Sequence, residues 1–194
     1  RGSFQSGTGL FYFDLFMASE DCRYIEYGLR PIAENYLKYF LTNDGEIILE
    51  REIFTWKQKE ESEQKNVAPE MHKYNDDFGA AMLQTAADIF QDQQYRDAAH
   101  RFARWLMEQQ EVDGAFCKGA HPSAVPVALM YFHDLGEYFQ DKELLSARET
   151  TLEKNTNTIQ RISTKIETLE SEILVLSADF HQEEELQNLY LRIQ

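Results

Sequence analysis

Two adjacent aspartates, Asp76 and Asp77, are the side chains in this sequence that are best placed to do chemistry. They lie in the stretch MHKYNDDFGAAM, directly before a run of apolar residues with helical spacing. Paired carboxyl groups can share proton transfer, one as a general acid and the other as a general base. The same residues also suit the first turn of a helix, with Asn75 as N-cap and acidic side chains near the positive end of the helix dipole. The sequence leaves both interpretations open.

Metal, cofactor and nucleophile motifs are weak or missing. His121 and His133 have no partner at metal-ligand spacing, so we expect packed or solvent-exposed histidines. The sequence therefore predicts no metal site and no cofactor. Cys22 and Cys117 are far apart in the chain, which fits two buried thiols better than a disulfide or a catalytic nucleophile.

The composition indicates a folded, acidic chain. Hydrophobic residues make up 43% of the 194 residues, which is too many for a disordered chain of this charge. A net charge of −15 would repel a phosphate backbone, so we expect no nucleic-acid partner. No apolar run reaches the roughly 20 residues that span a bilayer. The opening RGSFQSG lacks an initiator Met and a signal pattern, so we expect an excised piece or tag remnant, and the sequence assigns no compartment.

Three apolar segments with helical spacing, 9–18, 78–90 and 124–139, are each followed by an acidic turn and a second helix. In the second copy we expect Asp92 to cap the new helix, Tyr95 to pack one turn in, and Ala99 to allow close helix contact. The corresponding residues are Asp21, Tyr24 and Gly28 in the first copy, and Asp141, Leu144 and Arg148 in the third. The apolar segments should be buried on most sides.

The segment 95–110 is amphipathic and shows which face of the second helix points inward. Its predicted inward residues are Ala98, Phe102, Trp105 and Leu106, and its predicted outward residues are Arg96, Arg101, Arg104 and Glu108. The chain is thus predicted to be all-α, built of repeated inner and outer helical hairpins about 50 to 70 residues apart. The one exception is 47–54, where a short hairpin or an extended connection is predicted.

The segment WLMEQQEVDGAF (Trp105–Phe116), together with NDDFGAAMLQTAADIFQDQQY (Asn75–Tyr95), resembles the six-hairpin α/α-toroid proteins. These include glycoside hydrolases, unsaturated-uronyl hydrolases, sugar epimerases and polysaccharide lyases. The resemblance covers roughly residues 8–150 and about three hairpins in place of six. It implies a partial toroid, which is a fragment of a larger ring, an open arc, or half of a ring completed by a second chain.

The resemblance also implies where a site would lie, because in such toroids the loops that lead into the inner helices border one mouth of the ring. Glycoside hydrolysis uses two carboxyl groups about 5 to 9.5 Å apart, and consecutive Asp pairs occur in some toroid hydrolases, which implies a catalytic role for Asp76 and Asp77. The substrate-binding candidates on the same rim are His72, Tyr74, Asp113, Phe116, Lys118 and His121. Tyr74 and Phe116 would stack on sugar rings, with packing in the rim or core as the alternative.

From Leu152 onward the sequence has a seven-residue repeat. Its first positions are Leu152, Ile159, Ile166, Ile173 and Phe180, and its fourth positions are Asn155, Ile162, Leu169 and Leu176. This pattern predicts a coiled-coil helix, in which a polar Asn helps to fix the register. After Phe180 the pattern fails and resumes in a shifted phase at Leu186, so we expect a stutter or a break within 177–185. The helix would pack on its own body, on a second copy, or on a partner helix.

Two functions follow from these patterns, for a helical-hairpin domain at 1–151 and a coiled-coil tail at 152–194. The first is a carbohydrate-active protein, a glycoside hydrolase, lyase or sugar epimerase, that uses the Asp pair and binds a glycan or sugar. The second is a non-catalytic helical scaffold that oligomerises or docks on a partner through its coiled coil.

Overall fold

The computed structural model describes residues 2–48, 77–112, 114–116 and 124–193, and the side chains of 6–48, 79–112, 114–116 and 124–177. In these residues the regular structure is helical, apart from an isolated antiparallel bridge between Leu41 and Ile47. The predicted all-α class is confirmed. The chain divides into two compact units, Arg1–Leu152 and Glu153–Gln194.

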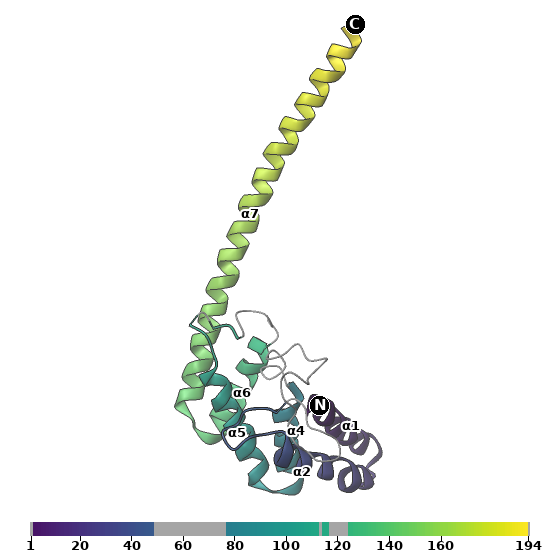
Figure 1. The fold of residues 1–194 in the computed structure, drawn as a ribbon, viewed down its shortest axis with the longest axis vertical. Coiled ribbons are helices and arrows are strands. Elements are labelled where there is room, and N and C mark those ends of the chain that lie inside the picture. The colour runs from purple at the N-terminus through teal and green to yellow at the C-terminus, as the bar shows by residue number, and fades with distance from the viewer. Residues whose placement is uncertain (1, 49–76, 113, 117–123, 194) are drawn as a thin grey trace. The chain divides into compact units, whose positions relative to one another are not determined.

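The first unit is a body of helices (Figure 1). Its elements are α1 (Gly2–Ser19), the π-helical segment η1 (Ile25–Leu29), α2 (Arg30–Tyr39), α4 (Asp77–Phe90), α5 (Gln93–Glu108), α6 (Ala124–Phe139) and the start of α7 (Lys142–Ile193). Helix α1 packs on η1, α2 and α4, while α5 packs on both α4 and α6. The helices are therefore stacked largely in chain order.

The turns after α1, α4 and α6 share one backbone geometry. The residue that follows each helix has a positive φ: 58° at Glu20, 54° at Gln91 and 53° at Gln140. In the second and third turns the next residue, Asp92 or Asp141, donates its N–H to the carbonyl five residues earlier, at 3.3 and 2.9 Å. This is the Schellman pattern, which satisfies a carbonyl at the helix end while the chain reverses.

An aspartate in each turn then caps the helix that follows. Asp92 Oδ1 accepts the backbone N–H of Gln94 at 3.1 Å, which confirms the predicted cap of α5. Asp21 Oδ1 accepts the N–H of Arg23 at 3.0 Å in the first turn. Asp141 Oδ1 accepts two N–H groups in the third turn. A side-chain acceptor here satisfies amides that have no partner within the helix.

The hydrophobic core lies between the stacked helices. On α5, the predicted inward residues Ala98, Phe102 and Leu106 are buried and Trp105 is partly buried, so the predicted inward face is confirmed. Phe102 meets the ring of Tyr131 on α6 edge-on, with centroids 5.9 Å apart. Such pairs add to the energy of apolar burial and fix the distance between the two helices.

Three expectations about exposure are wrong. The side chain of Arg96 is only 13% exposed, because its guanidinium lies over the Tyr138 ring, 4.3 Å from the centroid, and pairs with Asp88. Cys22 is an exposed free thiol, since it lies in the turn after α1; Cys117 is outside the described residues. On α1, Phe11 and Met17 are more than half exposed, because η1, α2 and α4 cover only the opposite part of its surface.

Gly45 closes the loop that follows α2 where the backbone approaches α5. Its φ is 95°, and an added Cβ would lie 2.2 Å from the backbone oxygen of Arg101. Ile47, two residues later, is buried and forms the bridge to Leu41. This bridge is a different pairing from the predicted 47–54 hairpin, of which residues 49–54 lie outside the described residues.

Helix α7 is 52 residues long and continues without interruption through 177–185 to Ile193. The backbone thus has no break at the change of phase in the repeat. In the described part of the chain, no helix combines the length and apolar character needed to cross a membrane.

Candidate functional site

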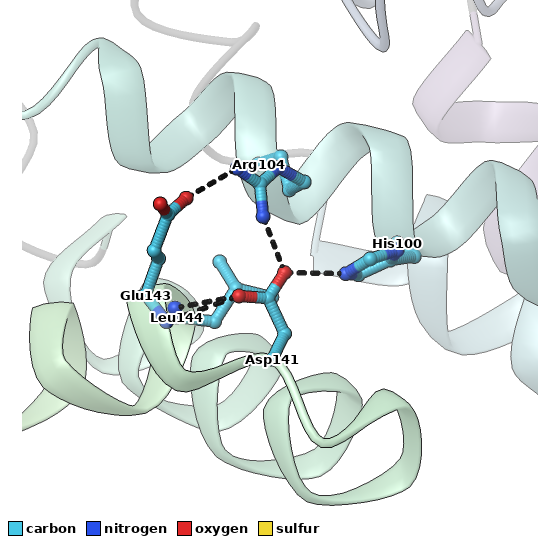
Figure 2. Close-up of polar contacts among 5 residues, drawn as sticks. All are labelled: His100, Arg104, Asp141, Glu143 and Leu144. Atoms are coloured by element: carbon cyan, nitrogen blue, oxygen red, sulfur yellow. Dashed lines mark hydrogen bonds and ion pairs between the residues drawn. The ribbon is translucent and has the colours of Figure 1, made fainter.

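Four side chains of the body form a polar cluster between α5 and the turn from α6 to α7 (Figure 2). They are His100 and Arg104 on α5, Asp141 in the turn, and Glu143 in the first turn of α7. His100 Nε2 and Arg104 Nη1 lie 2.8 and 2.6 Å from the same oxygen, Asp141 Oδ2. Arg104 Nη2 also pairs with Glu143.

The Asp141 carboxylate sits at the centre of the polar cluster. Its side chain is 8% exposed. Burial alone would raise the pKa of Asp141, but hydrogen bonds from His100, Arg104 and the Leu144 amide outweigh burial and lower it. The pKa of Arg104 is raised in turn by its hydrogen bonds to Glu143 and Asp141. Because an ionised carboxylate only accepts hydrogen bonds, Nε2 of His100 carries the hydrogen.

Both oxygens of Asp141 are occupied by protein donors. Oδ1 accepts the backbone N–H groups of Glu143 and Leu144 at 3.1 and 3.3 Å, while Oδ2 accepts from α5. The ring of His100 also stacks on Phe139, with centroids 4.1 Å apart and planes 11° apart. An aspartate with four donors is suited to hold the start of α7 against α5, and this is the structural role that the polar cluster can perform.

A second contact joins the end of α5 to α7 within the same unit. Thr151 is fully buried, and its hydroxyl accepts a hydrogen bond from Gln110 Nε2 at 2.7 Å and donates to the Ala147 carbonyl at 2.6 Å. Gln110 also donates to the carbonyl of Gly114 at 3.1 Å. Gln110, two residues after the end of α5, thereby ties the following turn to α7.

An equivalent packing contact occurs one hairpin earlier. The guanidinium of Arg30 lies over the ring of Phe90, 4.0 Å from its centroid, as His100 lies over Phe139. Phe90 and Phe139 are the last residues of α4 and α6. Arg30 follows Asp21 by nine residues, whereas His100 follows Asp92 by eight. The π-helical segment η1 absorbs the additional residue, since a π-turn holds one more residue than an α-turn.

Sequence reasoning missed the polar cluster, because Asp141 is separated from His100 and Arg104 by 41 and 37 residues. The available signal was the spacing of His100 and Arg104 by four residues, which puts both on one helix face. Arg104 was predicted to point to solvent, but in the structure its guanidinium pairs with Asp141 in the turn between α6 and α7.

The predicted substrate rim is mostly outside the described residues. This holds for His72, Tyr74, Asp76, Asp113, Lys118 and His121. Asp77 is the first residue of α4, and its side chain is not described. Phe116 is 1% exposed and belongs to the core, so its burial matches the core-packing alternative and leaves no ring face for a sugar. Across the described ranges, no three His, Cys, Asp or Glu side chains are grouped as metal ligands, and His133 is exposed.

The second candidate surface belongs to the unit Glu153–Gln194. Six apolar side chains lie along one face of α7 at the predicted heptad spacing, and we call them the apolar stripe. Its members are Ile159, Ile162, Ile166, Leu169, Ile173 and Leu176. Their exposed fractions range from 47% to 68%. A continuous exposed row of this kind marks an interaction surface in soluble proteins.

Comparison of the chain with protein-family models, with curated proteins and with solved structures found no match.

Proposed function

We propose that this protein is a non-catalytic helical scaffold that self-associates through the apolar stripe of α7. The observation that carries the proposal is the exposure of six Ile and Leu side chains at heptad spacing on one helix. A helix with this repeat buries its seam by winding around another helix. A second copy of the chain supplies an identical seam.

The apolar area of the stripe sets the energy available for association. Full burial of a Leu or Ile gains about 1.5–3 kcal/mol, so covering these half-exposed side chains gains about 1 kcal/mol each. Two copies contribute twelve side chains, or roughly 12 kcal/mol before costs. Association costs about 4–15 kcal/mol in lost freedom, so the stripe alone reaches an affinity on the order of micromolar only when this cost is near its lower end.

Substitution within the apolar stripe tests the proposal. The double change Ile166→Asp and Ile173→Asp puts two charges into the seam of each chain and should convert a dimer to a monomer in sedimentation experiments. The matched control is Thr164→Asp with Ser171→Asp, which adds the same charges on the outward face and should leave the dimer intact. A wild-type chain that stays monomeric at high micromolar concentration would refute self-association.

For the body we propose an open arc of α/α-toroid hairpins. Two features support it: the same positive-φ turn with a capping Asp occurs three times, and Arg30 and His100 make the same contact with the following hairpin. In stacked repeats each unit contacts mainly its neighbours, and this is the pattern of α1 to α6. Small-angle scattering of an Ile166→Asp, Ile173→Asp monomer would test the arc against a closed ring.

A carbohydrate-active role is the second candidate, as a glycoside hydrolase, lyase or sugar epimerase. It is supported by Asp77, which opens α4, a helix that packs between α1 and α5 as an inner helix would. Asp76→Asn or Asp77→Asn should then abolish turnover of a glycan while the melting temperature changes by only a few degrees. If these residues only start the helix, the same changes should cost about 0.5–2 kcal/mol of stability. A wild-type protein that turns over no member of a broad glycan panel would remove this candidate.

A further inference from the structure

We infer that two copies of the chain pair in parallel and in register along the apolar stripe, with an ion pair between Lys165 of one copy and Glu170 of the other. The inference rests on the proposed self-association and adds the orientation, the register and the residues that select them. Both charged side chains are exposed, and they flank the stripe on opposite sides.

The position of each charge follows from the heptad. With Ile159, Ile166 and Ile173 at the first positions, Lys165 occupies the seventh position of one heptad and Glu170 the fifth position of the next. In a parallel two-stranded coil these two positions face each other across the seam. Because the dimer has two-fold symmetry, the contact between Lys165 and Glu170 occurs twice. Within the stripe, the neighbouring pairs of this type are Thr158 with Ser163 and Glu172 with Ser177, and neither brings like charges together.

The second and third heptads of the stripe also favour two parallel strands, whereas the first has Ile at both core positions, Ile159 and Ile162. Ile, which is β-branched, occupies three successive first positions, and Leu occupies the fourth positions at Leu169 and Leu176. Branched residues at the first position with Leu at the fourth favour a parallel dimer over higher oligomers.

The antiparallel arrangement fits less well. The alignment that pairs most of the stripe sets Ile166 against Leu169, Ile162 against Ile173 and Ile159 against Leu176, and it brings Lys165 toward Glu172. This alignment gives Asn155 no second Asn across the seam. The parallel register sets Asn155 against its own copy, an arrangement that fixes register in coiled coils.

A charge-swap experiment on the full chain tests the orientation. Lys165→Glu alone puts a second carboxylate opposite Glu170 of the other copy, twice per dimer, and should raise the dissociation constant about tenfold. Glu170→Lys alone should have a similar effect. The double variant Lys165→Glu, Glu170→Lys restores opposite charges and should return the dissociation constant to within about twofold of wild type. The control, Glu167→Lys, makes the same charge change as Glu170→Lys but on the outward face. Its dissociation constant should stay within about twofold of wild type.

The outcomes separate this inference from the proposed function. If Lys165→Glu is rescued by Glu172→Lys and not by Glu170→Lys, the strands are antiparallel and the inference is overturned while self-association stands. If Ile166→Asp, Ile173→Asp separates the copies but neither single charge change weakens them, the ion pair is absent and the inference is again overturned. A monomeric wild type would overturn both.

Discussion

Replacing Asp141 with Ala should destabilise the body more than removal of any other capping aspartate. The carboxylate is almost fully buried and accepts four hydrogen bonds, two from the start of α7 and two from α5. Loss of an N-cap costs about 0.5–2 kcal/mol, and hydrogen bonds to charged groups contribute about 1.5–3 kcal/mol each. Arg104 is 39% exposed and is hydrated when its partner is lost, so its contribution to the lost free energy of unfolding is smaller. We expect a total loss of about 3 kcal/mol.

The assay is urea unfolding followed by the fluorescence of Trp105, which packs against Phe102 in the body. A Trp56→Phe background leaves Trp105 as the single Trp of the chain. For a unit of this size, about 3 kcal/mol corresponds to a fall in melting temperature of roughly 6–12 °C.

Two matched variants divide the effect into its parts. Asp92→Ala removes a cap without the contacts to a neighbouring helix and should cost only about 1 kcal/mol. Asp141→Asn keeps a good capping residue but loses the charge that His100 and Arg104 face, so its effect should lie between the two. Equal losses for Asp141→Ala and Asp92→Ala would show that the polar cluster contributes nothing beyond the cap.

Three further predictions concern the turns. Because the folded pKa of Asp141 is lowered, its contribution is complete above the usual Asp pKa of about 3.9 and is lost as the pH falls below it; the stability difference between wild type and Asp141→Asn should shrink only below about pH 4. Gln140→Gly should stabilise the body by about 0.5–1 kcal/mol by relieving the positive φ, and Gln140→Ala should not, as thermal melts would show. Gly45→Ala should destabilise it by about 2–3 kcal/mol, because the methyl group meets the Arg101 carbonyl; a neutral result in urea unfolding would contradict this close approach.

The sequence predicted the helical class, the inward face of α5 and the cap at Asp92, because each depends on residues within a turn or two of one another. Helical periodicity and capping chemistry are local. The expected exposure of Arg96 and the expected burial of Phe11 were wrong, because both depend on contacts between residues that are distant in the sequence. Whether a helix face is covered depends on which other helix packs there, and Tyr138 lies 42 positions from Arg96 in the sequence.

The two candidate surfaces differ in how far the sequence could predict them. The apolar stripe was evident in the sequence, since a seven-residue repeat puts its members on one face of any helix. The polar cluster was not, because His100 and Arg104 reach Asp141 only after α5 and the turn before α7 have packed together.

By itself, the sequence determined the helices, where several of them begin, and the heptad face of α7, since these follow from backbone hydrogen bonding and the period of the apolar residues. Only the tertiary structure decided that His100 and Arg104 reach Asp141, that Gly45 lies against Arg101, and that Phe116 is in the core. Such contacts join segments far apart in the chain, and their formation depends on shape and close packing that no local pattern encodes.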